Sequence, residues 1–356
     1  MPGRVLITGL NGYIATHTAA AFLRAGYSVR GTVRPSTPNV EAVVQALSKF
    51  HDGNRLEVVT VSDIGRDGAF DRAVEGTQAI AHLASPVSMA VEDPSEMMWA
   101  AVQGTTSLLA SALAESRRES GKGVLKSVVF MSSISAIVDP ISPPSHVFTE
   151  DDWNQYALAA TRGQLRHGHT ALKLGYLYYQ ASKVAAERAF WRFGRENKAP
   201  FSMVALCPAP VLGPPLYLPK SISNLSMRVK DIYDILRGGP IPESSPIRSA
   251  FVDVRDVAEL VFNAVEKANA TRTPPARYLV VGQSSVSPQE MANILREHYP
   301  ERRRTIRQGD PDRTYDPEKT RTFDATKARK LLGRPWIRFR QSVLDSADVF
   351  LAAKKV

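Results

Sequence analysis

Short apolar runs alternate with helix-length segments over the first third of the chain. Each run is almost continuously apolar, which is typical of strands in a parallel sheet whose two faces are both covered. The segment between the first two runs ends at Gly26, a residue type that favours the end of a helix. The alternation predicts an α/β fold with a parallel sheet and crossover helices. The runs are RVLITG, YSVRGTVR, LEVVTVSD, AIAHLAS and SVVFMSS.

The pattern changes at Cys207, where CPAPVLGPPLYLPKS begins. Its prolines exclude a helix interior or a central strand, so a loop or linker is predicted there. Residues 254–268 then have the pattern of an amphipathic helix and 276–282 that of a buried strand, which returns the chain to the first sheet. We predict a larger domain and a smaller C-terminal α/β lobe. The predicted bounds are 1–206 plus 251–282 for the domain, and 207–250 plus 283–356 for the lobe.

Composition describes an ordinary globular protein. The chain has 356 residues, of which 44% are hydrophobic and 22% charged, enough for one large domain carrying a smaller one. No stretch reaches the ~20 uninterrupted apolar residues of a membrane span, and no charged-then-apolar leader precedes the first run. We therefore expect a cytoplasmic protein with no membrane association.

Positive charge is concentrated near the C-terminus. The formal net charge is +10, and residues 301–356 contain ten Arg and five Lys against six Asp and two Glu. These charges alternate with apolar residues instead of forming a block interleaved with aromatic side chains. A solvated basic face is predicted, with an anionic substrate or partner as the alternative, and nucleic-acid binding is not expected.

Cysteine and histidine usage gives no indication of a metal. The single cysteine, Cys207, excludes an intrachain disulfide framework and a cysteine-rich zinc site, and a small buried residue is the expected role. The closest histidine pair, His167 and His169, has no third ligand type nearby. No metal site is predicted.

The first strand-to-helix turn has small residues where a phosphate group would lie. VLITGLNGYIATHTAA places Gly9, Gly12 and Ala15 between the first predicted strand and the first predicted helix. Small residues let the backbone approach a pyrophosphate, whose charge then lies at the helix N-terminus. Because the pattern follows a strand and opens a helix, it predicts dinucleotide binding.

The second strand indicates which dinucleotide is bound. A carboxylate about twenty residues past the glycine pattern would favour NAD, because it accepts from the ribose 2′-hydroxyl. This chain has no Asp or Glu between Ala25 and Val40, and it offers Arg34 in GTVRPST. An arginine fork suits a 2′-phosphate, so NADPH is predicted. Arg30, on the same strand face, is a weaker candidate for the same role.

Three polar side chains form a candidate site for chemistry. Tyr179 and Lys183 are four residues apart in GYLYYQASK, so on a helix they share one face, which Tyr176 and Tyr178 do not. The strand SVVFM ends in two serines whose side chains face opposite ways. Ligands bind at the carboxyl ends of parallel strands, so one of these hydroxyls with Tyr179 and Lys183 would supply three parts of a carbonyl reduction site.

Taken together, these motifs resemble those of the extended short-chain dehydrogenase/reductase family, in the branch of dihydroflavonol 4-reductases and methylglyoxal (carbonyl, aldehyde) reductases. The resemblance covers nearly the whole chain. It implies a doubly wound Rossmann sheet with a smaller substrate-binding lobe, and NADPH-dependent reduction of an aldehyde or ketone to an alcohol by a monomer or homodimer. It is carried by TGLNGYIA, HLASP, the Ser-Ser strand end, YYQASK, CPAPVLGPP, AFVDVRDVAELV and TFDATKARKLLG.

The resemblance also implies individual roles. Tyr179 would donate its phenolic proton to the substrate oxygen, Lys183 would lower the pKa of that phenol and hold the nicotinamide ribose, and Ser133 would hydrogen-bond the same oxygen. Asp63 would contact the adenine, residues 82–85 would line the ribose and nicotinamide, and residues 208–211 would pack beside the ring. The residues implied at the cofactor are Thr8, Gly9, Asn11, Gly12, Tyr13, Ile14, Arg34, Asp63, Ile64, Leu83, Ala84, Ser85, Pro86, Tyr179, Lys183, Pro208, Ala209 and Val211.

Two features depart from the family pattern. Gln103 stands in AAVQGTT where the family often has an asparagine. A proton relay that passes through this asparagine in the family is therefore not implied for this chain. The span from Ser133 to Tyr179 is also longer than is usual in this branch. The extra material, within residues 157–174, is expected to form a lid or to shape the pocket.

Other functions remain open at this point. A hydroxysteroid dehydrogenase or a sugar-nucleotide enzyme of the same superfamily would share the triad and differ in substrate. The apolar texture of SPVSMAV and LGPPLYLP favours a small apolar carbonyl over a nucleotide sugar. A regulator that binds NADPH without catalysis is a further alternative, but such proteins usually lose the Tyr or the Lys, and both are present here.

Overall fold

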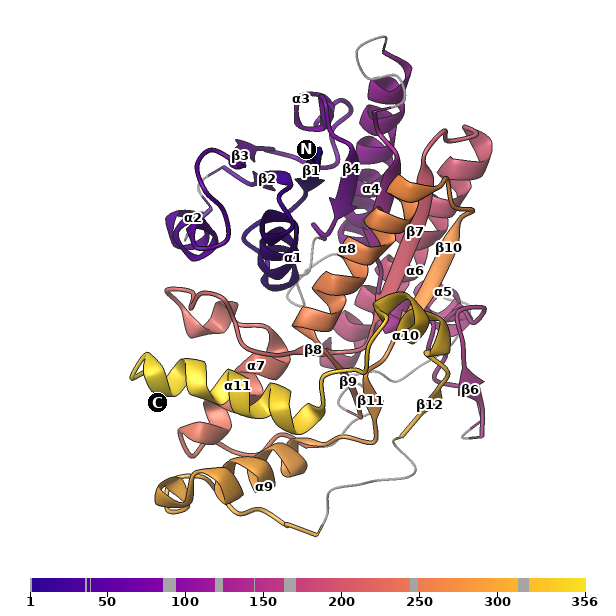
Figure 1. Ribbon diagram of the computed structural model, residues 1–356. Helices are drawn as coiled ribbons and strands as arrows, with labels where there is room; N and C mark the ends of the chain where they lie inside the picture. The colour runs from indigo at the N-terminus through magenta and orange to yellow at the C-terminus, as the bar shows by residue number, and fades with distance from the viewer. Residues whose placement is uncertain are drawn as a thin grey trace. The chain divides into compact units, whose positions relative to one another are not determined.

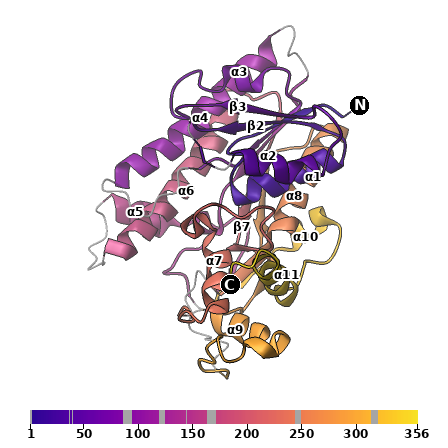
Figure 2. The same cartoon turned by 90° about the vertical axis from the view of Figure 1, so that its left-hand side faces the viewer.

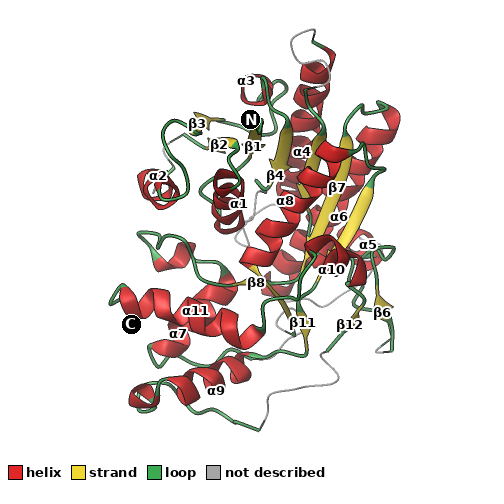
Figure 3. Ribbon diagram, viewed as in Figure 1, coloured by secondary structure: helices red, strands yellow, loops and turns green. Residues whose placement is uncertain are grey.

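A computed structural model describes residues 2–35, 37–38, 40–85, 94–118, 124–143, 145–162, 171–243, 249–312 and 320–356 of the chain. Strands and helices alternate along the first part of it, as Figure 3 shows by colour. The strands are β1 (Arg4–Ile7), β2 (Ser28–Val33), β3 (Leu56–Thr60), β4 (Ala79–His82), β5 (Ser127–Met131), β6 (Val147–Phe148), β7 (Ser202–Pro208), β8 (Val211–Leu212), β9 (Ala250–Asp253), β10 (Ala276–Val280), β11 (Gln283–Ser284) and β12 (Thr322–Phe323). The helices are α1 (Tyr13–Arg24), α2 (Val40–Ser48), α3 (Asp71–Val74), α4 (Pro94–Arg117), α5 (Gln155–Thr161), α6 (Ala171–Glu196), α7 (Met227–Leu236), α8 (Val254–Ala270), α9 (Pro288–His298), α10 (Thr326–Leu332) and α11 (Phe339–Ala352), with a 3₁₀ turn η1 (Ile134–Ala136).

The chain divides into two compact units. The first contains residues 1–142, 150–207 and 261–278, and the second contains 143–149, 208–260 and 279–356. Compared with the predicted bounds, residues 143–149, 251–260 and 279–282 group with the second unit, and Cys207 groups with the first. The substrate-binding role of the second part stays a prediction.

A seven-stranded sheet in the order β10-β7-β5-β4-β1-β2-β3 forms the centre of the first unit (Figure 1). From β1 the chain moves outward through β2 and β3, and then restarts at β4 on the other side of β1. Val5 is paired in parallel with Val29 on one side and with Ala79 on the other. The direction of strand order therefore reverses beside β1, which is where doubly wound sheets bind their ligands.

Helices cover both faces of this sheet. Figure 2 shows α4 and α6 on one face, and α1 with α2 on the other. Phe190 of α6 and Leu108 of α4 are buried in one hydrophobic cluster with sheet residues such as Val128. On the other face, Phe22 of α1 is fully buried and its ring contacts that of Phe262 in α8 at 5.3 Å. The predicted α/β fold with a parallel sheet covered on both faces is confirmed.

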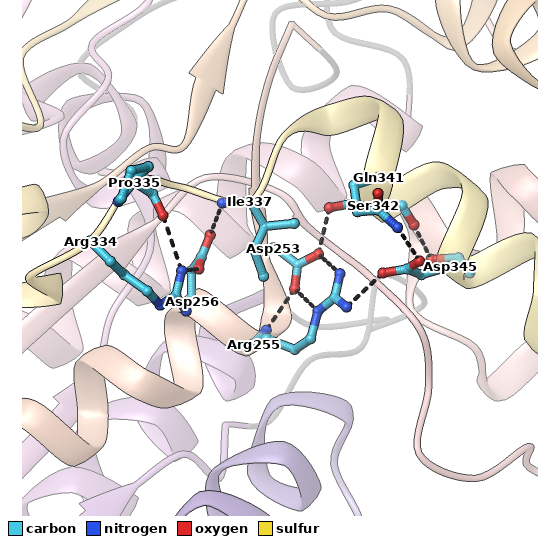
Figure 4. Close-up of polar contacts among 10 residues, drawn as sticks. Asp253, Arg255, Asp256, Arg334, Pro335, Ile337, Gln341, Ser342 and Asp345 are labelled. Carbon is cyan, nitrogen blue, oxygen red and sulfur yellow. Dashed lines mark hydrogen bonds and ion pairs between the residues drawn. The ribbon is translucent and has the colours of Figure 1, made fainter.

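The second unit is built from short strands and helices. β8, β9 and β11 form a three-stranded sheet, β6 and β12 pair in parallel, and α11 packs against α7 and α9. Figure 4 shows the charged residues that join these elements. Arg255 donates to Asp253 at 2.8 Å and to Asp345 of α11 at 2.6 Å. The Asp256 carboxylate, which is fully buried, is paired with Arg334 at 2.7 Å and accepts from the backbone N–H of Ile337 at 2.9 Å.

Part of the C-terminal positive charge is used inside the second unit. Arg302 donates to the carbonyls of Leu236 and Val356, and Arg307 donates to that of Gly238. These guanidinium groups satisfy backbone oxygens left open where helices and the chain end. Within the described residues, no helix is long and apolar enough to cross a membrane.

Candidate active site

The turn between β1 and α1 is shaped by glycine and is open to an anion. Gly9 has a left-handed φ of 70°, and a Cβ placed there would lie 3.2 Å from the Cα of Ala84. Gly12 caps α1 with extended backbone and has no side chain that could bond the first turn of that helix. A Cβ on Gly12 would lie 3.0 Å from the Gly9 carbonyl oxygen. The turn therefore has the close backbone approach at a helix N-terminus that a pyrophosphate needs.

Thr8 fixes the end of β4 against this turn. Its hydroxyl contacts Nδ1 of His82 at 2.9 Å and accepts from the backbone N–H groups of Leu83 at 3.0 Å and Ala84 at 2.9 Å. The Thr8 side chain is fully buried. The structure thus gives Thr8 a positioning role, and Leu83 and Ala84 are held beside Gly9 through it. Direct contact of these three residues with a cofactor stays a prediction.

Arg34 and Arg30 have different surroundings at β2. Arg34 follows the strand and is exposed. Arg30 is buried, donates through Nε to Glu57 at 2.8 Å, and donates through Nη1 to the carbonyl of Ala73 at 3.0 Å. Arg30 is therefore engaged in the packing of β2 against β3 and α3, and the prediction that it assists Arg34 is wrong. Arg34 remains the residue that could reach a 2′-phosphate.

The loop after β3 brings Asp63 and Ile64 toward α4. The Asp63 carboxylate accepts from the N–H of Gly65 at 2.9 Å, which folds the loop on itself. A Cβ on Gly65 would lie 3.4 Å from the Trp99 ring and 3.5 Å from the Cβ of Gln103, both on α4. Gln103 is thus placed beside the Asp63 loop, and its effect on a proton relay stays a prediction.

Tyr179 and Lys183 are brought to the end of β4 and β5 by α6. Lys183 is buried, donates from Nζ to Oγ of Ser85 at 3.1 Å, and its Nζ lies 5.9 Å from the centre of the Tyr179 ring. Tyr179 is partly buried, and its hydroxyl hydrogen-bonds the side chain of Ser133. Ser133 also accepts from the N–H of Ser135 at 3.1 Å, which caps η1 and orients its hydroxyl. The three residues predicted for catalysis therefore meet at one point.

Burial shifts the pKa of each ionisable group in this cluster. It raises the pKa of Tyr179, while the hydrogen bond from Ser133 acts in the opposite direction. It lowers the pKa of Lys183 to about 8, and it lowers the pKa of His82 to about 3, assisted by the charge of Lys183. The sequence led us to expect that Lys183 lowers the pKa of Tyr179. In this structure desolvation of the phenol has the larger effect, and it keeps the phenol protonated.

A small cavity opens between the ends of β4 and β5, α4 and α6. Four of the residues predicted at the cofactor line it: Ile64, Ala84, Ser85 and Lys183. His82 and Phe130 also contribute, and the polar groups of the wall are the Lys183 ammonium, the His82 ring and the hydroxyls of Ser85 and Thr105. Together with the glycine turn, the N-terminus of α1 and the exposed Arg34, the cavity has the features that fit a phosphorylated dinucleotide.

Comparison with known proteins places this geometry in a family. Residues 5–162 match the model of the NAD dependent epimerase/dehydratase family. The ketoreductase azaE of Aspergillus niger is 31% identical over 98% of this chain and 97% of its own length. The chain belongs to this family.

Solved structures agree with the fold. The structure of Gre2 from Candida albicans in complex with NADPH has a TM-score of 0.79 and 28% identity, and covers 99% of both chains. The yeast methylglyoxal/isovaleraldehyde reductase Gre2 complexed with NADPH also has a TM-score of 0.79, covering 99% of this chain and all of that one. Its identity of 24% supports the fold alone. The predicted resemblance to extended reductases of the methylglyoxal branch is confirmed.

Some of the residues that the family resemblance implies at the cofactor are not among the described residues of the first unit. Pro86 and residues 163–170, which include His167 and His169, fall outside the described residues. Pro208, Ala209 and Val211 belong to the second unit, so their position beside a nicotinamide stays a prediction. Cys207 is buried, as expected, and burial raises the pKa of its thiol.

Sequence reasoning missed a buried partner of the site. Ser132, the other serine at the end of β5, donates to the Glu187 carboxylate at 2.6 Å. Arg277 donates to the same carboxylate from Nε at 2.6 Å. Glu187 follows Lys183 by four residues in YQASKVAAE, the same spacing that separates Lys183 from Tyr179. Its place on the same face of α6 could therefore have been inferred. No local sequence signal indicates Arg277, because it comes from β10.

Proposed function

We propose that this protein reduces an aldehyde or ketone to an alcohol, with NADPH as the hydride donor. The observation that carries the proposal is the meeting of Tyr179, Lys183 and Ser133 beside the glycine turn of β1 and α1. Membership of the family supports it, as do the names of relatives that are ketoreductases or NADPH-bound reductases. The proposal is therefore an oxidoreductase acting on a carbonyl group.

The dinucleotide would be held by the first unit. Gly9, Asn11, Gly12 and the first turn of α1 at Tyr13 and Ile14 would receive the pyrophosphate. Arg34 would pair with the 2′-phosphate, since no carboxylate lies between Ala25 and Val40 to repel it. The remaining contacts would come from Asp63 and Leu83 and from the cavity residues Ile64, Ala84, Ser85 and Lys183. NADPH bound in this way would supply the hydride that the substrate carbon takes up.

The protein side chains supply the proton and hold the oxygen. Tyr179 keeps its proton over the neutral range because burial raises its pKa, so it can donate that proton to the developing alkoxide. Ser133 would donate a hydrogen bond to the same oxygen, from the side chain that already contacts the Tyr179 hydroxyl. Lys183, with a pKa of about 8, would contribute a positive charge near this oxygen at neutral pH.

We further propose a small apolar carbonyl as the substrate, with Pro208, Ala209, Val211 and the second unit shaping its pocket. A monomer or homodimer located in the cytoplasm is our expectation for the assembled protein. No nucleic-acid or membrane partner is part of the proposal.

Absorbance decay tests the activity directly. Purified protein is mixed with NADPH, and separately with NADH, against a panel from methylglyoxal through aryl ketones and dihydroflavonols to steroid ketones. Loss of NADPH with one carbonyl class, and much slower loss of NADH, is expected. Tight NADPH binding without turnover of any carbonyl would instead favour a cofactor-binding regulator or a sugar-nucleotide enzyme.

The role of Tyr179 has its own test. Tyr179→Phe removes the proton donor but keeps the ring, so turnover is expected to fall by roughly 10²–10⁴-fold while NADPH binding, followed by fluorescence, is retained. Tyr178→Phe is the matched control, since it removes a hydroxyl from the adjacent position of α6. Equal turnover in the two variants would disprove the assignment.

A further inference from the structure

A buried ion pair lies one helical turn beyond the proposed catalytic lysine. Glu187 follows Lys183 by four residues on α6 and is fully buried. Its carboxylate accepts from Arg277 twice, from Nε at 2.6 Å and from Nη2 at 3.1 Å. Trp191, one turn further along α6, donates its indole N–H at 3.1 Å. The carboxylate is therefore paired with a cation and satisfied by a further neutral donor.

The same carboxylate anchors the strand end that carries Ser133. Ser132 donates to Oε2 of Glu187 at 2.6 Å, and because adjacent strand residues face opposite ways, this fixes the side on which the Ser133 hydroxyl lies. Arg277 extends the anchor with a bond from Nη1 to the carbonyl of Glu150 at 2.8 Å. Its guanidinium also lies 3.8 Å from the centre of the Trp153 ring. One buried pair thus connects β10, α6, the end of β5 and the segment before α5.

Among the charged and titratable groups around Lys183, Glu187 is the nearest anionic side chain on α6. His82, from β4, is neutral because burial and the lysine charge lower its pKa to about 3. Cys207, from β7, is a neutral thiol because burial raises its pKa. Tyr179 is protonated for the same reason. Arg277, from β10, is a cation bound to Glu187. The residues of α4 that line the cavity carry no charge.

From this arrangement we propose that Glu187 is a positioning residue, which holds Lys183 in its cationic form and aligns Ser133 through Ser132. The inference rests on the function proposed above, because it assigns Glu187 a task in that reaction. The physical reason is electrostatic: burial favours the neutral amine, and negative charge at Cys207 or Glu187 favours the ammonium. Because burial keeps the Cys207 thiol neutral, that charge belongs to Glu187. Glu187 itself need not contact substrate or cofactor.

The first test replaces the charge and keeps the shape. In Glu187→Gln, the pH at which Lys183 loses its proton is expected to fall by about one unit. This is measured without cofactor from the ¹³Cε chemical shift of labelled lysine, with the signal assigned by Lys183→Met. The alkaline limb of kcat/KM for carbonyl reduction is expected to move to lower pH by the same amount.

Three variants separate charge from packing. Trp191→Phe removes a neutral donor from the same carboxylate, so the Lys183 midpoint should stay in place even if Tm falls. Glu187→Asp retains the charge and should restore most of the wild-type midpoint. Ser132→Ala should lower kcat severalfold while leaving the midpoint of Lys183 unchanged, because it affects only the alignment of Ser133.

If Glu187→Gln does not fold, the double variant Glu187→Gln with Arg277→Gln leaves no uncompensated buried charge. Because it also removes the Arg277 cation, its Lys183 midpoint is expected to fall by less than in the single variant. A Lys183 midpoint that stays within about 0.2 of the wild-type pH in Glu187→Gln, or in the double variant where only that one folds, would overturn the inference, whatever the effect on stability. A wild-type protein that reduces no carbonyl would overturn the proposed function instead, and the cofactor-free titration would still decide the role of Glu187.

Discussion

Tyr179, Lys183 and Glu187 occupy successive turns of one face of α6, and each has a different partner. The phenol hydrogen-bonds Ser133, the ammonium hydrogen-bonds Ser85, and the carboxylate binds Arg277. The spacing of four makes the first two predictable from sequence. The side chain that completes the ion pair comes from a strand and lies 90 residues further along the chain, so periodicity alone could not reveal it.

Arginine at the end of β2 illustrates how packing decides between residues of equal chemistry. The sequence pattern gives Arg30 and Arg34 the same direction along β2, but Arg30 is buried against Glu57 and the carbonyl of Ala73, while Arg34 follows the strand and is exposed. The sequence shows that both are cations, but not which one remains available.

Arg34→Ala should change cofactor preference. Loss of a charge-assisted contact with a 2′-phosphate is expected to raise KM for NADPH by about 10- to 100-fold and to leave KM for NADH nearly unchanged. Steady-state kinetics with both cofactors measure this. Arg118→Ala, which removes an exposed arginine paired with Glu75 of the same unit, is the control. A rise in KM for both cofactors alike would argue against the 2′-phosphate assignment.

The β1-α1 turn could be predicted from the sequence, but the tertiary contacts that its residues make could not. Its glycines follow a strand and open a helix, which is visible in the sequence. The reason Gly9 is needed is not visible there: the end of β4, seventy-five residues later, approaches to within contact of it. The same holds for Thr8, whose hydroxyl bonds the backbone of Leu83 and Ala84. Local pattern predicts the element, and tertiary approach supplies the reason for individual residues.

Gly9→Ala is expected to weaken NADPH binding by tenfold or more. A methyl at this position would lie 3.2 Å from the backbone of Ala84, so the turn and the end of β4 must move apart. Gly53→Ala is the matched control, because Gly53 has a similar φ of 73° with no atom within 4 Å of an added Cβ. Both variants should lose about 1–3 kcal/mol of stability from the left-handed φ. Equal NADPH affinity in the two, measured by fluorescence titration, would show that contact with Ala84 is not needed for binding.

At the scale of the whole chain, charge has a structural use that composition does not reveal. The basic excess of residues 301–356 predicted a solvated face, yet Arg302 and Arg307 donate to backbone carbonyls and Arg334 binds a buried aspartate. Net charge describes the field around a protein, and it does not show which charges are committed to internal bonds. The motif AFVDVRDVAELV is a further case, because both of its aspartates are fully buried and paired with arginines.

Arg255→Ala should therefore lower the stability of the protein far more than loss of a surface arginine. Asp253 is fully buried and is paired with Arg255, which also holds Asp345 (Figure 4). Removing one partner of a buried pair leaves a charge in the interior at a cost of about 3–5 kcal/mol. Arg340→Ala is the control in the same helix as Asp345: its pair with Glu297 is exposed, so its loss should change stability little. Urea unfolding of both variants measures the difference, and similar losses would mean that the Asp253 carboxylate is satisfied by its remaining bonds from Ser342 and from the backbone N–H of residue 255.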